Sequence, residues 1–152
     1  MKYKIVMLMA LLFVGCASSG PHTRGEFDII LTPNVWTEIQ ETNAYWNRNM
    51  IYDDSKPFHW AIPLDFRGDC KNIALAKQAD LKSKNIPSYI ATCNVWDHVP
   101  SGHAVTIVHT DRGDFVLDII GHRRVFNINN SLYTWTGIEC EDRLWRKLDY
   151  NK

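Results

Sequence analysis

The chain has 152 residues, which suits one domain and leaves little room for a second. Apolar residues make up 45% and charged residues 22% of the sequence, so it can bury an ordinary core and is not a disordered chain. Seventeen Lys and Arg balance seventeen Asp and Glu, which argues against a nucleic-acid binder that relies on a broad basic face. No apolar run reaches the roughly 20 residues of a membrane-spanning helix, so a multi-pass membrane protein is excluded.

The first 15 residues have the pattern of a secretory signal, with two early lysines and an apolar run over Ile5–Val14. The small residue before Cys16 makes this end similar to a bacterial lipobox, in which the cysteine is lipidated and becomes the new N-terminus. Phe13 departs from the leucine that is usual in that motif. The alternatives are a plain secretory signal and an uncleaved anchor helix. We expect a membrane-anchored lipoprotein of the bacterial cell envelope.

Residues 16–26 are small and polar, as in a flexible tether, and residues 27–152 are expected to form the folded domain. Apolar residues at helical spacing predict a first helix over about residues 33–47. Residues 53–63 contain two prolines and an Asp-Asp pair, which predict a loop.

A second helix is expected to begin at Asp69 and Cys70, because the Asp69 side chain can cap free N–H groups and an Ala-rich run follows. Asn85 and Pro87 are residues that end a helix. Lys77 falls on the apolar face of this helix and interrupts that face, unless its stem packs in the core and its amine reaches solvent.

Beyond the second helix the apolar residues alternate, which is typical of strands. An Asp-Arg-Gly-Asp sequence at residues 111–114 predicts a hairpin turn between the two middle strands. Helices followed by an antiparallel sheet predict an α+β domain. The predicted strands cover residues 89–95, 103–110, 115–120 and 124–128.

Cys70 is the candidate nucleophile. A cysteine in the first turn of a helix meets free N–H groups and the positive end of the helix dipole, which favour the reactive thiolate. A nucleophile of this kind needs a base, and the base needs a third group to orient it. His103 and Asp118 are the candidates for these two roles, because strand alternation places both on one face of the predicted hairpin.

The register of that hairpin is left open by the sequence. With Arg112-Gly113 at the centre of the turn, His103 and Asp118 are staggered by about 13 Å along the strands. With Thr110-Asp111 at the centre, the two residues lie directly opposite each other. Both registers keep them on one face, and we expect Asp114 to point away from that face.

Two other interpretations of these residues compete with a triad. The cysteine and the histidine can each be ordinary core residues, and from the residues alone a triad and a chance combination are equally supported. Cys93, His98 and His103 raise the possibility of a metal site, but their spacing matches no standard zinc pattern. We therefore expect neither a metal nor a cofactor.

Several short motifs follow one another in a characteristic order: Trp60–Leu64, Arg67–Cys70 with Ile73–Lys77 after it, Gly102–Val105, Thr110–Asp114, Val116–Asp118 and the closing Trp145. In these motifs the sequence resembles the bacterial transglutaminase-like cysteine peptidases, over about residues 34–148. This resemblance implies a papain-like fold in which a helix carries the nucleophile Cys70 and an antiparallel sheet carries the base His103 and the orienting Asp118.

One departure from the family pattern concerns calcium. Family members commonly have acidic residues directly after the nucleophile, and in calcium-dependent members these acids help to hold the ion. Here Lys71 and Asn72 stand in those positions, so a hard cation loses oxygen ligands and we expect activity without calcium. Lys71 is either a further stabiliser of the thiolate or a solvated lysine at the helix start.

The expected function is an envelope thiol hydrolase that cleaves a peptide or amide bond of a peptide or protein substrate through an acyl-enzyme. Two alternatives are an acyl transferase with the same triad and a non-catalytic envelope module that binds a peptide. A fold alone does not fix the substrate.

We predict a disulfide between Cys93 and Cys140, because Cys16 is assigned to lipidation, Cys70 must stay free, and disulfides persist in the envelope. A loop of this size would stabilise the fold by about 4 kcal/mol in the chain-entropy model. Mass spectrometry of the non-reduced, alkylated protein should find a linked Cys93–Cys140 peptide and alkylation at Cys70. Alkylation at Cys93 and Cys140 as well as at Cys70 would show that Cys93 and Cys140 are two separate thiols and would rule out the bridge.

Overall fold

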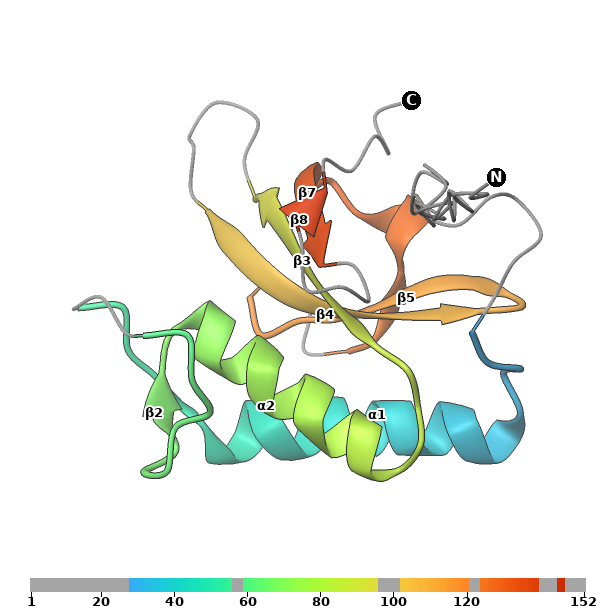
Figure 1. Ribbon diagram of the computed structural model, residues 1–152, viewed down its shortest axis with the longest axis horizontal. Helices are drawn as coiled ribbons and strands as arrows, with labels where there is room; N and C mark the ends of the chain where they lie inside the picture. The colour runs from blue at the N-terminus through green and yellow to red at the C-terminus, as the bar shows by residue number, and fades with distance from the viewer. Residues whose placement is uncertain (1–27, 56–58, 96–101, 121–123, 140–144, 147–152) are drawn as a thin grey trace, which may run out of the picture.

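The computed structural model describes residues 28–55, 59–95, 102–120, 124–139 and 145–146. In these parts of the chain, two helices lie side by side beneath one curled antiparallel sheet (Figure 1). The predicted α+β class is therefore confirmed. The predicted signal, Cys16 and the tether lie outside the described residues and stay predictions.

Helix α1 covers Pro33–Asn49 and starts where the sequence predicts. Thr32 caps it, because its side chain accepts a hydrogen bond from the N–H of Val35 at 3.2 Å. Proline at the first helical position needs no N–H partner, which suits this start. The helix runs two residues further than predicted, to Asn49, and the backbone becomes extended at Met50.

Helix α2 covers Cys70–Ser83, with Asp69 as its N-cap, as predicted. At its other end, Asn85 adopts a positive φ of 59°, which ends the helix as a left-handed residue. The N–H of Ile86 then bonds back to the carbonyl of Leu81 at 2.9 Å. A side chain therefore sets the start of the helix, and the backbone conformation of Asn85 sets its end.

The main sheet has six strands in the order β6-β5-β4-β3-β7-β8, and all neighbours are antiparallel. The sequence analysis missed the last two, and it also missed a parallel pair of two-residue strands, β1 and β2, between the helices. The strands are β1 Ile51–Tyr52, β2 Arg67–Gly68, β3 Tyr89–Asn94, β4 His103–Thr110, β5 Gly113–Leu117, β6 Phe126–Asn127, β7 Thr134–Glu139 and β8 Trp145–Arg146.

The sheet has a buried core on each face. Alternate residues of β4 pack against the helices, and Thr106 also donates a hydrogen bond to the carbonyl of Ala74 in α2 at 2.9 Å. The intervening residues, such as Val105, pack with Trp135 and Ile138 of β7 on the other face. The sheet curls around this second core, so β7 lies on the side of the sheet away from the helices (Figure 1).

Lys77 is buried in full, amine included. Its side chain is only 1% exposed, and its amine does not reach solvent but donates to Asn43 of α1 at 2.8 Å. Burial lowers the pKa of Lys77 to about 7, while the negative charge of Asp118 opposes this shift. α1 and α2 are therefore joined by a buried polar contact.

Within the described residues, none of the helices is both long and apolar enough to cross a membrane.

The buried lysine makes the stability of the fold depend on pH. Its pKa in the folded state is below its ordinary value, so the unfolded chain binds the proton more tightly between about pH 7 and 10.5. Burial of the protonated lysine therefore destabilises the folded state fully below about pH 7, and this destabilisation is lost as the pH rises toward 10.5. Lys77→Met should raise the Tm relative to the unmodified chain more at pH 6 than at pH 9, as measured by circular dichroism. Lys82→Met, an exposed change on the same helix, is the control; equal shifts at both pH values would contradict the prediction.

Candidate active site

Cys70 is the first residue of α2 and is partly buried against Ala74, Ile90 and Ala104. The Asp69 carboxylate accepts hydrogen bonds from the N–H groups of the next turn, including that of Lys71 at 3.2 Å. The thiol therefore lies at the positive end of the helix dipole.

The antiparallel pairing of β4 and β5 brings His103 and Asp118 to the same end of the sheet. β4 begins at His103, and Asp118 follows directly after β5, whose last pair is Leu117 with Thr106. The turn centre is Asp111-Arg112, so the observed register lies between the two that the sequence left open. The stagger between His103 and Asp118 is two residues, or about 7 Å along the strands, and the predicted shared face is retained.

His103 and Asp118 form a buried pair, with His103 Nε2 and Asp118 Oδ1 2.7 Å apart and both residues at most 3% exposed. Because Nε2 faces the carboxylate, Nδ1 is the ring nitrogen left for the thiol. Burial lowers the pKa of His103, but hydrogen bonds to Asp118 and to Cys70 outweigh it and raise the pKa to about 9. A pKa of about 9 keeps the imidazole protonated at neutral pH.

The Asp118 carboxylate receives three further hydrogen bonds. Oδ1 accepts from the N–H groups of Ile119 at 2.5 Å and Ile120 at 3.1 Å, and Oδ2 accepts from the hydroxyl of Tyr133. Burial raises the pKa of Asp118, but the hydrogen bond and charge of His103, together with Tyr133, lower it below its usual range. Asp118 is therefore ionised although it is buried.

Tyr133 is a site residue that the sequence analysis missed. It precedes β7, which was not predicted, and its ring also packs edge-on against His103 with centroids 6.1 Å apart. Burial raises the pKa of Tyr133, and Asp118 raises it further, so its hydroxyl keeps the proton that it donates. An aromatic residue before a strand gives no sequence signal for this contact.

The backbone of Asp118 is held from the opposite side by α1. Asn47 Nδ2 donates to the carbonyl of Asp118 at 2.7 Å and lies 3.4 Å from Asn43 Oδ1, which also accepts from Lys77. Side chains of both helices thus belong to the network that holds the backbone of Asp118. The sequence analysis missed both asparagines, because a buried amide has no periodic signature.

Tyr52 lies beside the nucleophile. The β1–β2 pairing places it opposite Gly68, two residues before Cys70. Burial raises the pKa of Tyr52 to about 12, and Cys70 is the largest of the negative charges that add to this shift. Tyr52, which is 39% exposed, is therefore a neutral group beside Cys70.

The other described cysteine is not suited to react. Cys93 is fully buried and pairs across the sheet with His103. Burial raises the pKa of the Cys93 thiol, and the charges of Asp118 and Cys70 raise it further, so it stays a thiol. Cys93 is a free thiol in the structure, and Cys140 lies outside the described residues, so the Cys93–Cys140 bridge stays a prediction.

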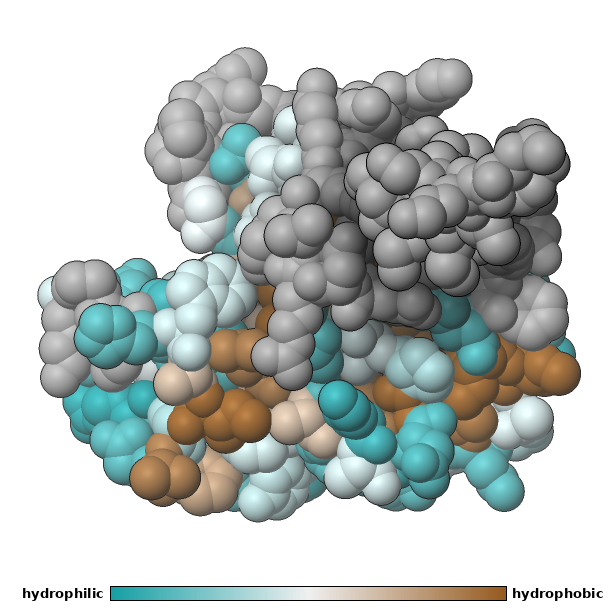
Figure 2. Space-filling view, viewed as in Figure 1, coloured by the Kyte–Doolittle hydropathy of each residue, from teal (hydrophilic) through white to brown (hydrophobic). Residues whose placement is uncertain are grey.

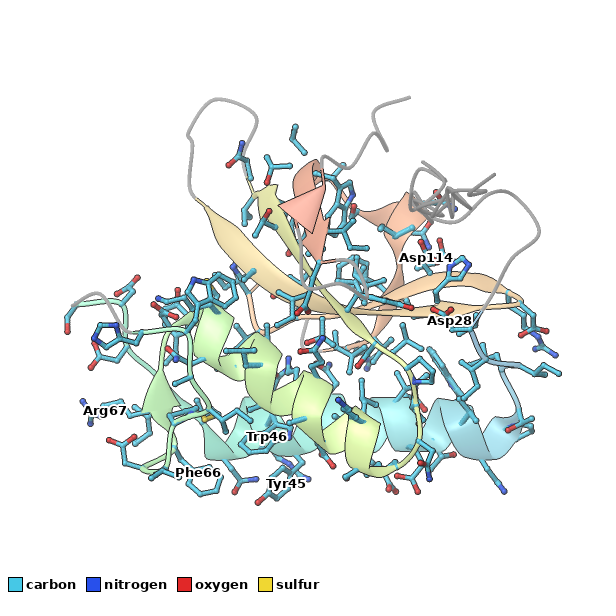
Figure 3. All side chains as sticks on the ribbon, viewed as in Figure 1. Asp28, Tyr45, Trp46, Phe66, Arg67 and Asp114 are labelled. Atoms are coloured by element: carbon cyan, nitrogen blue, oxygen red, sulfur yellow. The ribbon has the colours of Figure 1, made fainter. Side chains whose placement is uncertain are left out.

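The expectation for Asp114 is wrong. Asp114 pairs with His109 across β4 and β5 and forms an ion pair with its Nδ1, so it shares the face of His103 and Asp118. This second His–Asp pair lies near the turn, at the end of the sheet away from Arg67 and the start of α2 (Figure 3). It is therefore remote from Cys70.

No metal centre is evident in the part of the chain that the structure describes: it contains no group of three or more His, Cys, Asp or Glu side chains that could hold an ion. His98, a member of the metal site considered from the sequence, lies outside that part.

The pKa of His103 provides a test of the buried pair. The hydrogen bond to Asp118 is the largest cause that raises this pKa, so Asp118→Asn should move the His103 titration from about 9 toward lower pH. Nuclear magnetic resonance of ¹⁵N-histidine-labelled protein measures the midpoint directly. Asp114→Asn is the matched control, because it removes the carboxylate of the second pair and should leave His103 unchanged. An unchanged His103 midpoint in Asp118→Asn would contradict the assignment.

Comparison with solved structures shows the same fold in Legionella pneumophila LapG. One LapG structure matches with a TM-score of 0.62 and 18% identity over 73% of this chain and 68% of that chain. The calcium-bound structure matches with a TM-score of 0.60 and 17% identity over 72% of this chain and 67% of that chain. The EGTA-treated structure matches with a TM-score of 0.56 and 15% identity over 67% of this chain and 61% of that chain. The chain thus spans about 61–68% of the length of these LapG chains.

No curated protein matches the sequence. A family does: residues 15–152 match the family described as bacterial transglutaminase-like cysteine proteinase. The match covers nearly the whole chain, and the expected resemblance is confirmed. The chain belongs to the bacterial transglutaminase-like cysteine proteinases.

Proposed function

We propose that this chain is a cell-envelope cysteine peptidase in which Cys70, His103 and Asp118 act as nucleophile, acid–base and orienting carboxylate. The observation that carries the proposal is the buried His103–Asp118 pair at 2.7 Å, whose other ring nitrogen is left for a thiol at a helix N-terminus. The envelope setting rests on the signal-like first 15 residues and on Cys16 as a lipid anchor.

In the first half of the reaction, the Cys70 thiolate attacks the carbonyl carbon of the scissile amide and forms a tetrahedral oxyanion. As this intermediate collapses, the C–N bond breaks and His103 donates its proton to the leaving amine. The remaining acyl group is a thioester on Cys70. In the second half, His103 takes a proton from water, the hydroxide attacks the thioester, and the thiolate leaves.

The backbone N–H of Cys70 is the proposed donor to the oxyanion. The Asp69 carboxylate already uses the N–H groups of Lys71 and Asn72, so the N–H of Cys70 is the first-turn donor that this cap does not use. Lys71 also forms an ion pair with Asp69, which offsets a negative charge next to the thiolate.

The protein substrate is proposed to approach over an apolar rim. The chain that leads into β2 exposes four large apolar residues in alternation, and Figure 2 shows apolar surface among polar residues in this region. Phe66 is fixed there by stacking on Trp46 of α1, with ring centroids 5.7 Å apart (Figure 3). The four residues are Trp60, Ile62, Leu64 and Phe66.

A thiol-directed probe tests the mechanism without a known substrate. Cys70→Ser should abolish labelling by a biotinylated iodoacetamide, and His103→Ala should slow it by about 10²-fold or more, because the thiolate loses its partner. His109→Ala is the matched control, since it removes the histidine of the second pair, and it should label at the normal rate. Equal rates for the two histidine variants would contradict the role of His103.

Turnover is tested on proteins from a bacterial envelope extract. The unmodified chain should create new N-termini, identified by mass spectrometry, that Cys70→Ser does not create. With dansylcadaverine present, an acyl transferase would attach this amine to acceptor proteins, whereas a peptidase would not. The absence of both new N-termini and attached amine would favour a non-catalytic binding module.

A further inference from the structure

Asn72, in the first turn of α2, ties three segments of backbone together. Its side chain is buried, and Nδ2 donates to the carbonyls of His59 at 2.8 Å and Ala61 at 2.7 Å. Its Oδ1 accepts from the N–H of Asp69 at 3.2 Å. A carboxamide has two N–H donors, and both are used on the 59–61 segment. This segment is therefore fixed to the helical turn that carries Cys70.

The strand before the nucleophile is shaped around the same side chain. A Cβ atom at Gly68 would lie 2.7 Å from Asn72 Cβ and 2.8 Å from its Oδ1, closer than such atoms approach. Gly68 is in β2 and accepts a hydrogen bond from the N–H of Asp53 at 3.0 Å. The contact thus fits Asn72 between β2, the 59–61 segment and α2.

Two carbonyl oxygens that converge on one point need a donor or a cation at that point. Asn72 supplies two N–H donors to His59 and Ala61. A carboxylate at position 72 would instead place acceptor oxygens against acceptor oxygens, an arrangement that needs a bound cation between them. The neighbouring charge is also balanced, because the ammonium of Lys71 pairs with Asp69.

These residues do not fit calcium. Calcium binds six to eight oxygen ligands. In this chain the carbonyl oxygens of His59 and Ala61 accept hydrogen bonds from the Asn72 amide. The Asp69 carboxylate pairs with the Lys71 ammonium and accepts hydrogen bonds from N–H groups at the start of α2. LapG, by contrast, has a calcium-bound structure.

We propose that Asn72 and Lys71 take the place of a bound cation in this chain. The amide of Asn72 holds the 59–61 segment against the start of α2, and the ammonium of Lys71 neutralises Asp69. The position of Cys70 then needs no divalent ion, and activity persists in excess chelator. Only this last consequence rests on the proposed function; the structural part is independent of catalysis.

The test is thermal unfolding in EGTA and in millimolar calcium, followed by circular dichroism. The unmodified chain should have the same Tm in both. Asn72→Asp should lower the Tm in EGTA by about 5–10 °C, because two hydrogen bonds become oxygen–oxygen contacts. Asn130→Asp, the same change on an exposed side chain, is the control and should have little effect.

The double variant Lys71→Glu/Asn72→Asp restores acidic residues at both positions. Calcium should raise its Tm, since an ion that binds only the folded state stabilises that state. A calcium-dependent Tm in the unmodified chain would overturn the proposal. So would a double variant whose Tm does not respond to calcium, or an Asn72→Asp variant as stable as Asn130→Asp.

Lys71→Glu alone keeps the test decisive when the double variant does not fold. It retains the Asn72 amide, so it should remain folded and insensitive to calcium, and a calcium-dependent Tm would overturn the proposal. All measurements are repeated with Cys70→Ala, which removes the thiol. A failure of the catalytic proposal then leaves the result on Asn72 unaffected.

Discussion

The hydrogen bond between His103 and Asp118 is the interaction on which the site depends. A carboxylate that is 1% exposed is costly unless its oxygens are bonded, and here four donors reach it. They come from the start of β4, from the two N–H groups after Asp118 and from Tyr133 ahead of β7, while α1 holds the Asp118 carbonyl. Each element near the site thus serves to keep one ionised group in a fixed place.

The parts of the site that follow a local pattern could be predicted from the sequence. Asp69 before an Ala-rich run marks the start of α2, and alternation places His103 and Asp118 on one face whichever register is chosen. The register itself could not be predicted, because residues 110–113 allow more than one turn centre, and the structure has Asp111-Arg112 there. β7 was missed although it pairs with β3, since Gly137 interrupts its apolar alternation.

The buried polar residues could not be predicted for a different reason. The contacts of Asn43, Asn47 and Lys77 join α1, α2 and Asp118 across 34 and 71 residues of sequence. Such contacts obey no period, and each residue taken alone suits a solvent-exposed helix face. Lys77 is buried between the two helices, whereas Lys71 forms an ion pair with Asp69 at the start of α2.

Asn72 shows how the size of a side chain and the shape of the backbone constrain each other. The third helical position of a capping box usually has Glu or Gln, whose longer chains reach back to the cap. Asn is shorter, and it reaches the N–H of Asp69 here while lying against Gly68, where no Cβ keeps it away. The same close approach aims its two N–H groups at His59 and Ala61. Gly68 and Asn72 therefore depend on each other: a side chain at position 68 would displace Asn72, and the hydrogen bonds to His59 and Ala61 need the amide that Gly68 leaves room for.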